Sequence, residues 1–160
     1  MSRHRLASVL AAALLLAPLA AGSQTAPTPP AYRPGLGDLM TLTVQPRHFK
    51  IGLAGAQQNW AYAAYEVHEL EEAFERIERQ VPKWREFDIP ALIASTVKQP
   101  LDALEAAAKA KSPTQFDDAY RQLTAACNAC HQSANLAMIV IRTPQSDSPF
   151  ANQDFRPQKP

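Results

Sequence analysis

Apolar residues recur every three or four positions along most of this chain, which is the spacing of helices that bury one face. The pattern predicts a first helix over residues 36–55, kinked or divided into two short helices at Pro46, because proline lacks the amide donor of a helix interior. It predicts a second helix over residues 57–80, which Pro82 ends. The glutamate-rich face of this helix, which includes Glu66, is expected to meet water. The apolar face of the second helix consists of Trp60, Ala63, Val67, Leu70, Phe74 and Ile77.

Two further helices are predicted in the C-terminal half. Asp88 opens about two turns of helix in a connector, and a third helix is predicted over residues 100–111. The sequence SPTQ at 112–115 has the form of a capping box with proline at the first helical position, so a fourth helix is expected over residues 113–141. Four such helices with short connections predict an all-α fold, an antiparallel four-helix bundle. The predicted buried positions of the fourth helix are Phe116, Tyr120, Leu123, Cys127, Ala134, Met138 and Ile141.

The N-terminus has the composition of a secretory signal. Arg3 and Arg5 precede an apolar run at residues 6–20, and small residues that suit signal peptidase follow. The run is too short to span a bilayer, so we expect a cleaved signal, no membrane anchor afterwards, and a mature protein in the periplasm. The expected organisation is a signal peptide at 1–23, a Pro-rich lead-in at 24–35, the bundle at 36–141 and a Pro-containing tail at 142–160.

Net charge bears on the kind of partner, and length bears on the number of domains. The full chain has a net charge of +1, and loss of Arg3 and Arg5 with the signal changes it to −1. A protein that binds nucleic acid presents a basic face, so we expect no nucleic-acid partner. The mature length suits one small domain with a single core.

Both cysteines of the protein lie in the short segment CNACH, as Cys127 and Cys130, and His131 follows directly. On a helix these residues stand at i, i+3 and i+4, so they project from one face. Two thiols and an imidazole on one face of an exported protein fit covalent attachment of haem c. The thiols add to the two vinyl groups, and the imidazole binds the iron.

Three other cysteine chemistries fit the sequence less well than haem. A disulfide between Cys127 and Cys130 closes so small a loop inside a helix that it strains the backbone and stabilises little. A zinc site needs a fourth ligand, for which the mature chain offers only His48 and His68. A thioredoxin-type redox pair needs a βαβ context, and the pattern here is helical.

Residues 100–133, PLDALEAAAKAKSPTQFDDAYRQLTAACNACHQS, resemble the C-terminal half of cytochrome c-prime and its six-coordinate relatives. The resemblance implies a periplasmic four-helix bundle with one haem near the end of the last helix. In that family the first helix covers the other haem face, and LGDLMTLTVQPRHFK, residues 36–50, resembles the covering segment and would bring Met40 over the iron. Such bundles often pair through their first two helices, so the resemblance implies a homodimer. It also implies redox partner proteins. The apolar stretch NLAMIVI, residues 135–141, departs from the family pattern.

Four side chains are candidates near the sixth coordination position of the iron. Met40 lies on the apolar face of the first helix, where it is either that ligand or an ordinary core methionine. His48 is the second choice, since it ligates only if the kink turns it inward; otherwise it lies at the surface or the haem edge. His68 stands among glutamates and is expected in water, and Met138 is expected in the core.

Arg47 and Lys50 are candidate partners for haem propionates, whose charge a guanidinium or ammonium group offsets. The alternative for both residues is an ordinary solvated helix face.

Two functions remain. The first is a soluble electron carrier rather than an enzyme, because the sequence has one haem motif and no arrangement of residues for substrate turnover. The second is a haem protein with an open iron position that binds nitric oxide or carbon monoxide. Ligation by Met40 distinguishes them, because a bound thioether occupies the position that a gas needs.

Overall fold

The computed structural model describes residues 31–144 and 155–157. The predicted signal peptide and most of the predicted lead-in and tail lie outside these residues. The described chain is mostly helical, as predicted. None of its helices combines the length and the apolar composition that crossing a bilayer requires.

The helices are joined by short connections and one small hairpin. In chain order the elements are α1 (Leu36–Leu39), the π-helix η1 (Met40–Val44), α2 (Gln45–Ala56), α3 (Trp60–Gln80), β1 (Lys83–Trp84), β2 (Phe87–Asp88), α4 (Ile89–Thr96), α5 (Lys98–Ala110) and α6 (Pro113–Ser133). The two strands form an antiparallel pair in which Trp84 lies opposite Phe87.

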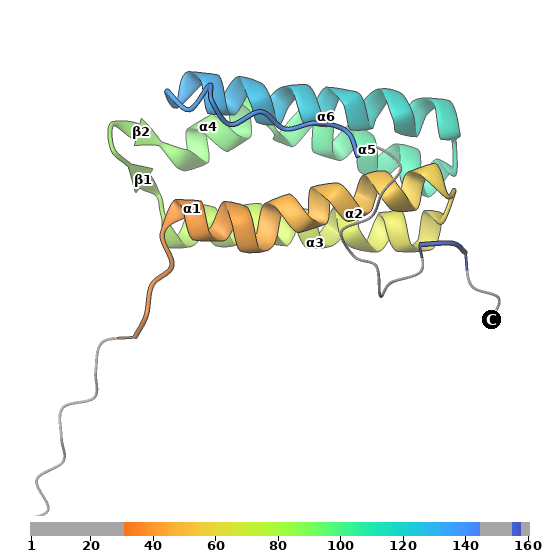
Figure 1. Cartoon of the computed structure of the whole chain (residues 1–160), viewed down its shortest axis with the longest axis horizontal. Helices are drawn as coiled ribbons and strands as arrows, with labels where there is room; N and C mark the ends of the chain where they lie inside the picture. The colour runs from red at the N-terminus through yellow and green to blue at the C-terminus, as the bar shows by residue number, and fades with distance from the viewer. Residues whose placement is uncertain (1–30, 145–154, 158–160) are drawn as a thin grey trace, which may run out of the picture. The chain divides into compact units, whose positions relative to one another are not determined.

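The four longest helices enclose the core. α2 packs on α3, α3 on α5, α5 on α6 and α6 on α2, while α4 packs against α5 and α6 (Figure 1). The predicted apolar face of α3 is buried except for Trp60, which is half-buried. The largest fully buried side chains are Phe116, Ile51, Leu70, Ile77, Leu104, Leu123, Val67 and Val97.

The predicted interruption at Pro46 takes the form of a π-helical turn. η1 directly precedes α2, and Pro46 lies in the first turn of α2. The amide of Gln45 donates to the carbonyl of Met40, five residues back. Proline supplies no amide and its ring clashes with the carbonyl four residues before it, so a wider turn relieves both problems without ending the helix.

Several helix starts follow local sequence signals. The Asp88 carboxylate accepts a hydrogen bond from the Ala91 amide (2.9 Å), so Asp88 caps α4 as predicted. α6 begins at Pro113 as predicted, but the Ser112 side chain makes no capping bond, so the predicted capping box is absent there. α3 begins at Trp60, after the cap Asn59, and not at residue 57.

The predicted end of the last helix is wrong. α6 stops at Ser133, because Asn135 adopts a left-handed conformation (φ 59°). The Leu136 amide donates to the His131 carbonyl (2.7 Å) and the Asn135 amide to the Gln132 carbonyl (3.1 Å), which is a Schellman ending.

Residues 134–144, here called the return segment, then run back along α6 (Figure 1). Met138 lies in this segment and is 78% exposed, so its predicted place in the core is also wrong. Ile141, predicted as a buried helical position, is half-buried in the return segment.

Candidate functional site

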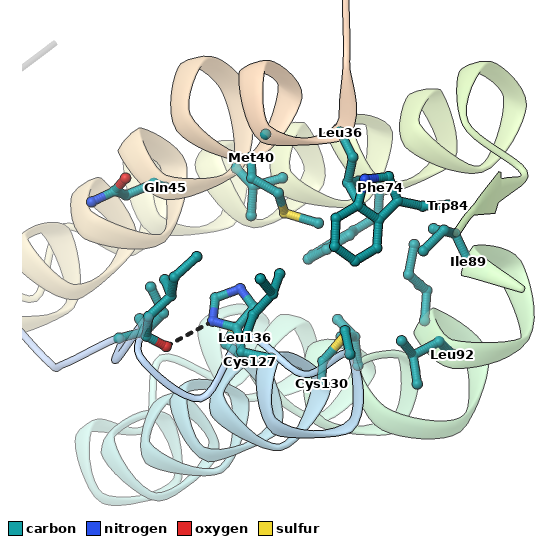
Figure 2. A pocket seen from close by; sticks show the side chains of 18 of the residues that line it. Leu36, Met40, Gln45, Phe74, Trp84, Ile89, Leu92, Cys127, Cys130 and Leu136 are labelled. Carbon is teal, nitrogen blue, oxygen red and sulfur yellow. Dashed lines mark hydrogen bonds between the residues drawn. The ribbon is translucent and has the colours of Figure 1, made fainter. Parts of the chain in front are cut away.

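A cavity of about 310 Å³ lies between α1 and η1 on one side and the end of α6 on the other. α4 and the hairpin contribute Trp84, Ile89 and Leu92 to one side of it (Figure 2). Leu136 of the return segment contributes to its α6 side (Figure 2). The lining is predominantly apolar, so a ligand that fits here is a large and mostly apolar one.

The predicted haem-attachment residues line this cavity together. Cys127, Cys130 and His131 all come from the last two turns of α6. Their common exposure to one space follows from their positions at i, i+3 and i+4. The two cysteines are free thiols, not a disulfide.

Both thiols are held in their neutral form. Burial, with a smaller contribution from Cys130, raises the pKa of Cys127 to about 12. Burial also raises the pKa of Cys130, although a hydrogen bond with the Thr96 side chain opposes the shift. A redox-active cysteine pair needs the opposite, a lowered thiol pKa. An uncharged thioether, by contrast, suits such an apolar site.

The imidazole of His131 has a defined tautomer. Its Nδ1 lies 3.0 Å from the carbonyl oxygen of Ile139 in the return segment. A carbonyl only accepts, so Nδ1 carries the hydrogen and donates it. In the neutral ring Nε2 is then left with a free lone pair, which is the arrangement of a metal-binding histidine.

Met40 belongs to η1 and reaches the cavity from the side opposite α6 (Figure 2). Its sulfur points into the space towards which the Cys130 sulfur also points (Figure 2). Met40 is half-buried and packs against the core. A thioether therefore faces the side of the cavity that carries the two cysteines.

His48 lies inside the protein, and both of its ring nitrogens face buried polar side chains. It is only 4% exposed, so the surface alternative is wrong, and it lines the edge of the cavity instead. Thr124 Oγ1 donates to the Tyr120 carbonyl, so it accepts the hydrogen of His48 Nε2 (2.9 Å). Nδ1 then has no hydrogen and faces the Tyr120 hydroxyl (3.2 Å), whose single hydrogen it shares with the nearer His48 carbonyl oxygen (2.7 Å). Burial lowers the pKa of His48 to about 4, so the ring is neutral.

Arg47 and Lys50 point to α3 instead of the cavity. Arg47 lies 3.3 Å from Glu66 and 2.8 Å from Glu69, and Lys50 lies 3.6 Å from Glu66. Neither cation is among the described residues that line the cavity. Glu66 is 2% exposed, so its predicted contact with water is wrong: the two cations and the Tyr62 hydroxyl (2.6 Å) compensate its burial.

The remaining histidine of the helical region, His68, is exposed as predicted and lies 3.4 Å from Glu72. Across the described ranges, no three His, Cys, Asp or Glu side chains gather as they would around a bare metal ion. The sequence interpretation missed the cavity wall from α4 and the hairpin. It also missed the Ile139 carbonyl, for which Asn135, a common residue just past a helix end, was the available signal.

Comparisons with models of protein families, with curated proteins and with solved structures found no match to this chain.

Proposed function

We propose that this protein is a periplasmic c-type cytochrome, an antiparallel four-helix bundle that carries one covalent haem and transfers electrons. The observation that supports this most is that Cys127, Cys130 and His131 line one cavity. The Nδ1 hydrogen of His131 is bonded to the Ile139 carbonyl, which leaves Nε2 for the iron. The cavity is apolar and is reached from the opposite side by Met40. These residues fit a haem.

Each residue then has a separate task. Cys127 and Cys130 hold the porphyrin edge through thioether bonds, and His131 presents Nε2 to the iron. The haem supplies the one-electron chemistry when it is bound. The apolar side chains exclude water, which keeps the surroundings of the charge change rigid and of low polarity.

Met40 is the sixth ligand in this proposal, and His48 is not. Both ring nitrogens of His48 face polar side chains inside the protein, so its ligation would cost the bond to Thr124 and the contact with the Tyr120 hydroxyl. The Met40 thioether has no such bonds to lose. A thioether ligand favours ferrous iron and raises the reduction potential, which suits an electron carrier.

The attachment of haem is tested by mass spectrometry of protein made with a cytochrome c maturation system. We expect the mass of one haem on the mature chain, retained after acid and organic extraction. The Cys127→Ala, Cys130→Ala double variant should carry none. Haem that extracts freely from the unmutated protein would contradict the proposal.

Ligation by Met40 is tested by the Met40→Ala variant, with Met138→Ala as the matched control because Met138 is exposed. We expect Met40→Ala to convert low-spin iron to high spin, lower the reduction potential and open the ferrous form to carbon monoxide. Met138→Ala should change none of these properties. If the unmutated ferrous protein is high spin and binds carbon monoxide at once, gas binding replaces electron transfer as the proposed function.

A further inference from the structure

Asn128 occupies a helical position that its side chain does not favour, since asparagine competes with the helix backbone for hydrogen bonds. It lies between the two cysteines of α6 and is half-buried. Its amide nitrogen donates to the Thr124 carbonyl (3.0 Å) on its own helix and to the Ile141 carbonyl (2.9 Å) in the return segment. Its side-chain oxygen accepts from the Ile141 amide (2.7 Å).

The pair of bonds between Asn128 and Ile141 has a chemical requirement. One side chain must both donate to and accept from the backbone of a single residue, and a carboxamide does this at one end of a short stem. Aspartate offers no donor, and an apolar residue offers neither group. The presence of asparagine within a helix is therefore explained by this contact to the return segment.

The return segment is held at further points on both sides of Ile141. The Schellman ending ties its first residues to the end of α6. At its other end Pro144 lies against Gly52 of α2, where a Cβ atom would come within 2.6 Å of the proline Cγ. Between these points Ile139 presents its carbonyl oxygen to His131 Nδ1 at 3.0 Å.

We infer that Asn128 is a positioning residue for His131: by clamping the return segment it holds the Ile139 carbonyl on Nδ1, and so sets the strength with which Nε2 donates to iron. The inference rests on the proposed function. Its physical basis is that a backbone acceptor on one ring nitrogen fixes the ring orientation and raises the basicity of the other nitrogen. A more basic imidazole stabilises ferric iron, so the clamp lowers the reduction potential.

The test compares Asn128→Ala with Gln132→Ala in the haem-loaded protein. Gln132 is exposed and belongs to the same end of α6, one residue past His131. We expect Asn128→Ala to shift the ratio of oxidised to reduced protein roughly tenfold at a fixed potential, which is an upward shift of ~59 mV. NMR should show faster solvent exchange of the His131 Nδ1 hydrogen in that variant. Gln132→Ala should alter neither property.

A second variant acts from the other side of the clamp. Ile141→Pro removes the backbone amide that donates to the Asn128 side-chain oxygen, and it leaves the CNACH segment intact. It should therefore raise the reduction potential, as Asn128→Ala does. It decides the question if Asn128→Ala fails to attach haem.

Three outcomes are distinguishable. A raised potential together with faster Nδ1 exchange supports the inference. A return segment that becomes sensitive to protease while the potential stays constant shows a merely structural clamp and overturns it. If the unmutated chain carries no covalent haem, the proposed function fails, and the Nδ1 exchange in the unmutated chain and its variants then shows whether the clamp still holds the Ile139 carbonyl.

Discussion

The two ends of the helical region are filled in different ways. At the end where α2 meets α3 and α5 meets α6, Phe116 is fully buried and lies edge-on to Trp60 (5.5 Å between ring centroids). Gly55 lies so close to Phe116 that a Cβ atom there would come within 2.0 Å of the ring. At the other end the side chains enclose the cavity of about 310 Å³. We call these the packed end and the cavity end.

Under the proposed function, the chain completes its own core at the packed end and the haem completes it at the cavity end. At the packed end the Phe116 ring leaves no room for even one added methyl group at Gly55. At ~24 cal/mol per Å³, filling a space as large as the cavity with an apolar group is worth up to about 7 kcal/mol. The cavity end is thus the part of the fold that haem attachment would stabilise most.

The largest expected effect is the loss of covalent haem in the Cys127→Ala, Cys130→Ala double variant. We expect a free energy of unfolding lower by up to about 7 kcal/mol, because the attached haem fills the cavity only when the chain is folded. In hydrogen exchange, amides of α1, η1 and α4 should lose protection, while those around Phe116 keep it. Equal loss of protection at both ends would contradict the idea that haem stabilises the cavity end more than the packed end.

The next effect is the loss of stability at low pH that burial of the His48 side chain causes. His48 has an ordinary pKa of 6.5 and a folded pKa of about 4. Between these values the unfolded chain binds a proton that the folded chain does not. Stability from neutral His48 is therefore complete above pH 6.5 and is lost as the pH falls to 4, by about 3 kcal/mol in total.

Chemical denaturation of the unmutated protein and of His48→Gln between pH 7 and pH 4 measures this effect. The difference in stability between the two proteins should shrink as the pH falls, because glutamine does not titrate. A constant difference across that range would show that His48 is not kept neutral by its burial.

The smallest effect compares one glycine at each end. Gly55→Ala should destabilise the protein by at least about 1–3 kcal/mol, because the new methyl group must displace the Phe116 ring. Gly37 lines the cavity, and a Cβ there meets nothing within 4 Å. Gly37→Ala should stabilise α1 by about 0.5–1 kcal/mol, since alanine loses less backbone entropy in a helix. Thermal unfolding of both variants checks whether the signs are opposite.

Local signals predicted three features of the helices for which a neighbour in sequence supplies the reason. The apolar face of α3, the cap at Asp88 and the start of α6 at Pro113 depend on residues within a turn or two, and all three were predicted correctly. The common face of Cys127, Cys130 and His131 follows in the same way from helical spacing.

Two of the errors occur where the partner is distant in sequence. His48 is bonded to Thr124, 76 positions away, and Glu66 is compensated by Arg47, 19 positions away. Neither contact changes the local pattern of apolar residues, so that pattern cannot predict it. A polar residue within a polar face is indistinguishable from a solvated one until its partners are known.

Local sequence patterns are enough to predict that the chain forms helices and that two thiols and an imidazole share one helix face. Tertiary structure alone decided what that face meets: a cavity closed by α4 and the hairpin, the Met40 thioether opposite, and the Ile139 carbonyl on Nδ1 of His131. The physical reason lies in residues 134–144. Their apolar spacing resembles more helix, but a single left-handed residue, Asn135, reverses the chain, and the Asn128 carboxamide bonds it back to α6.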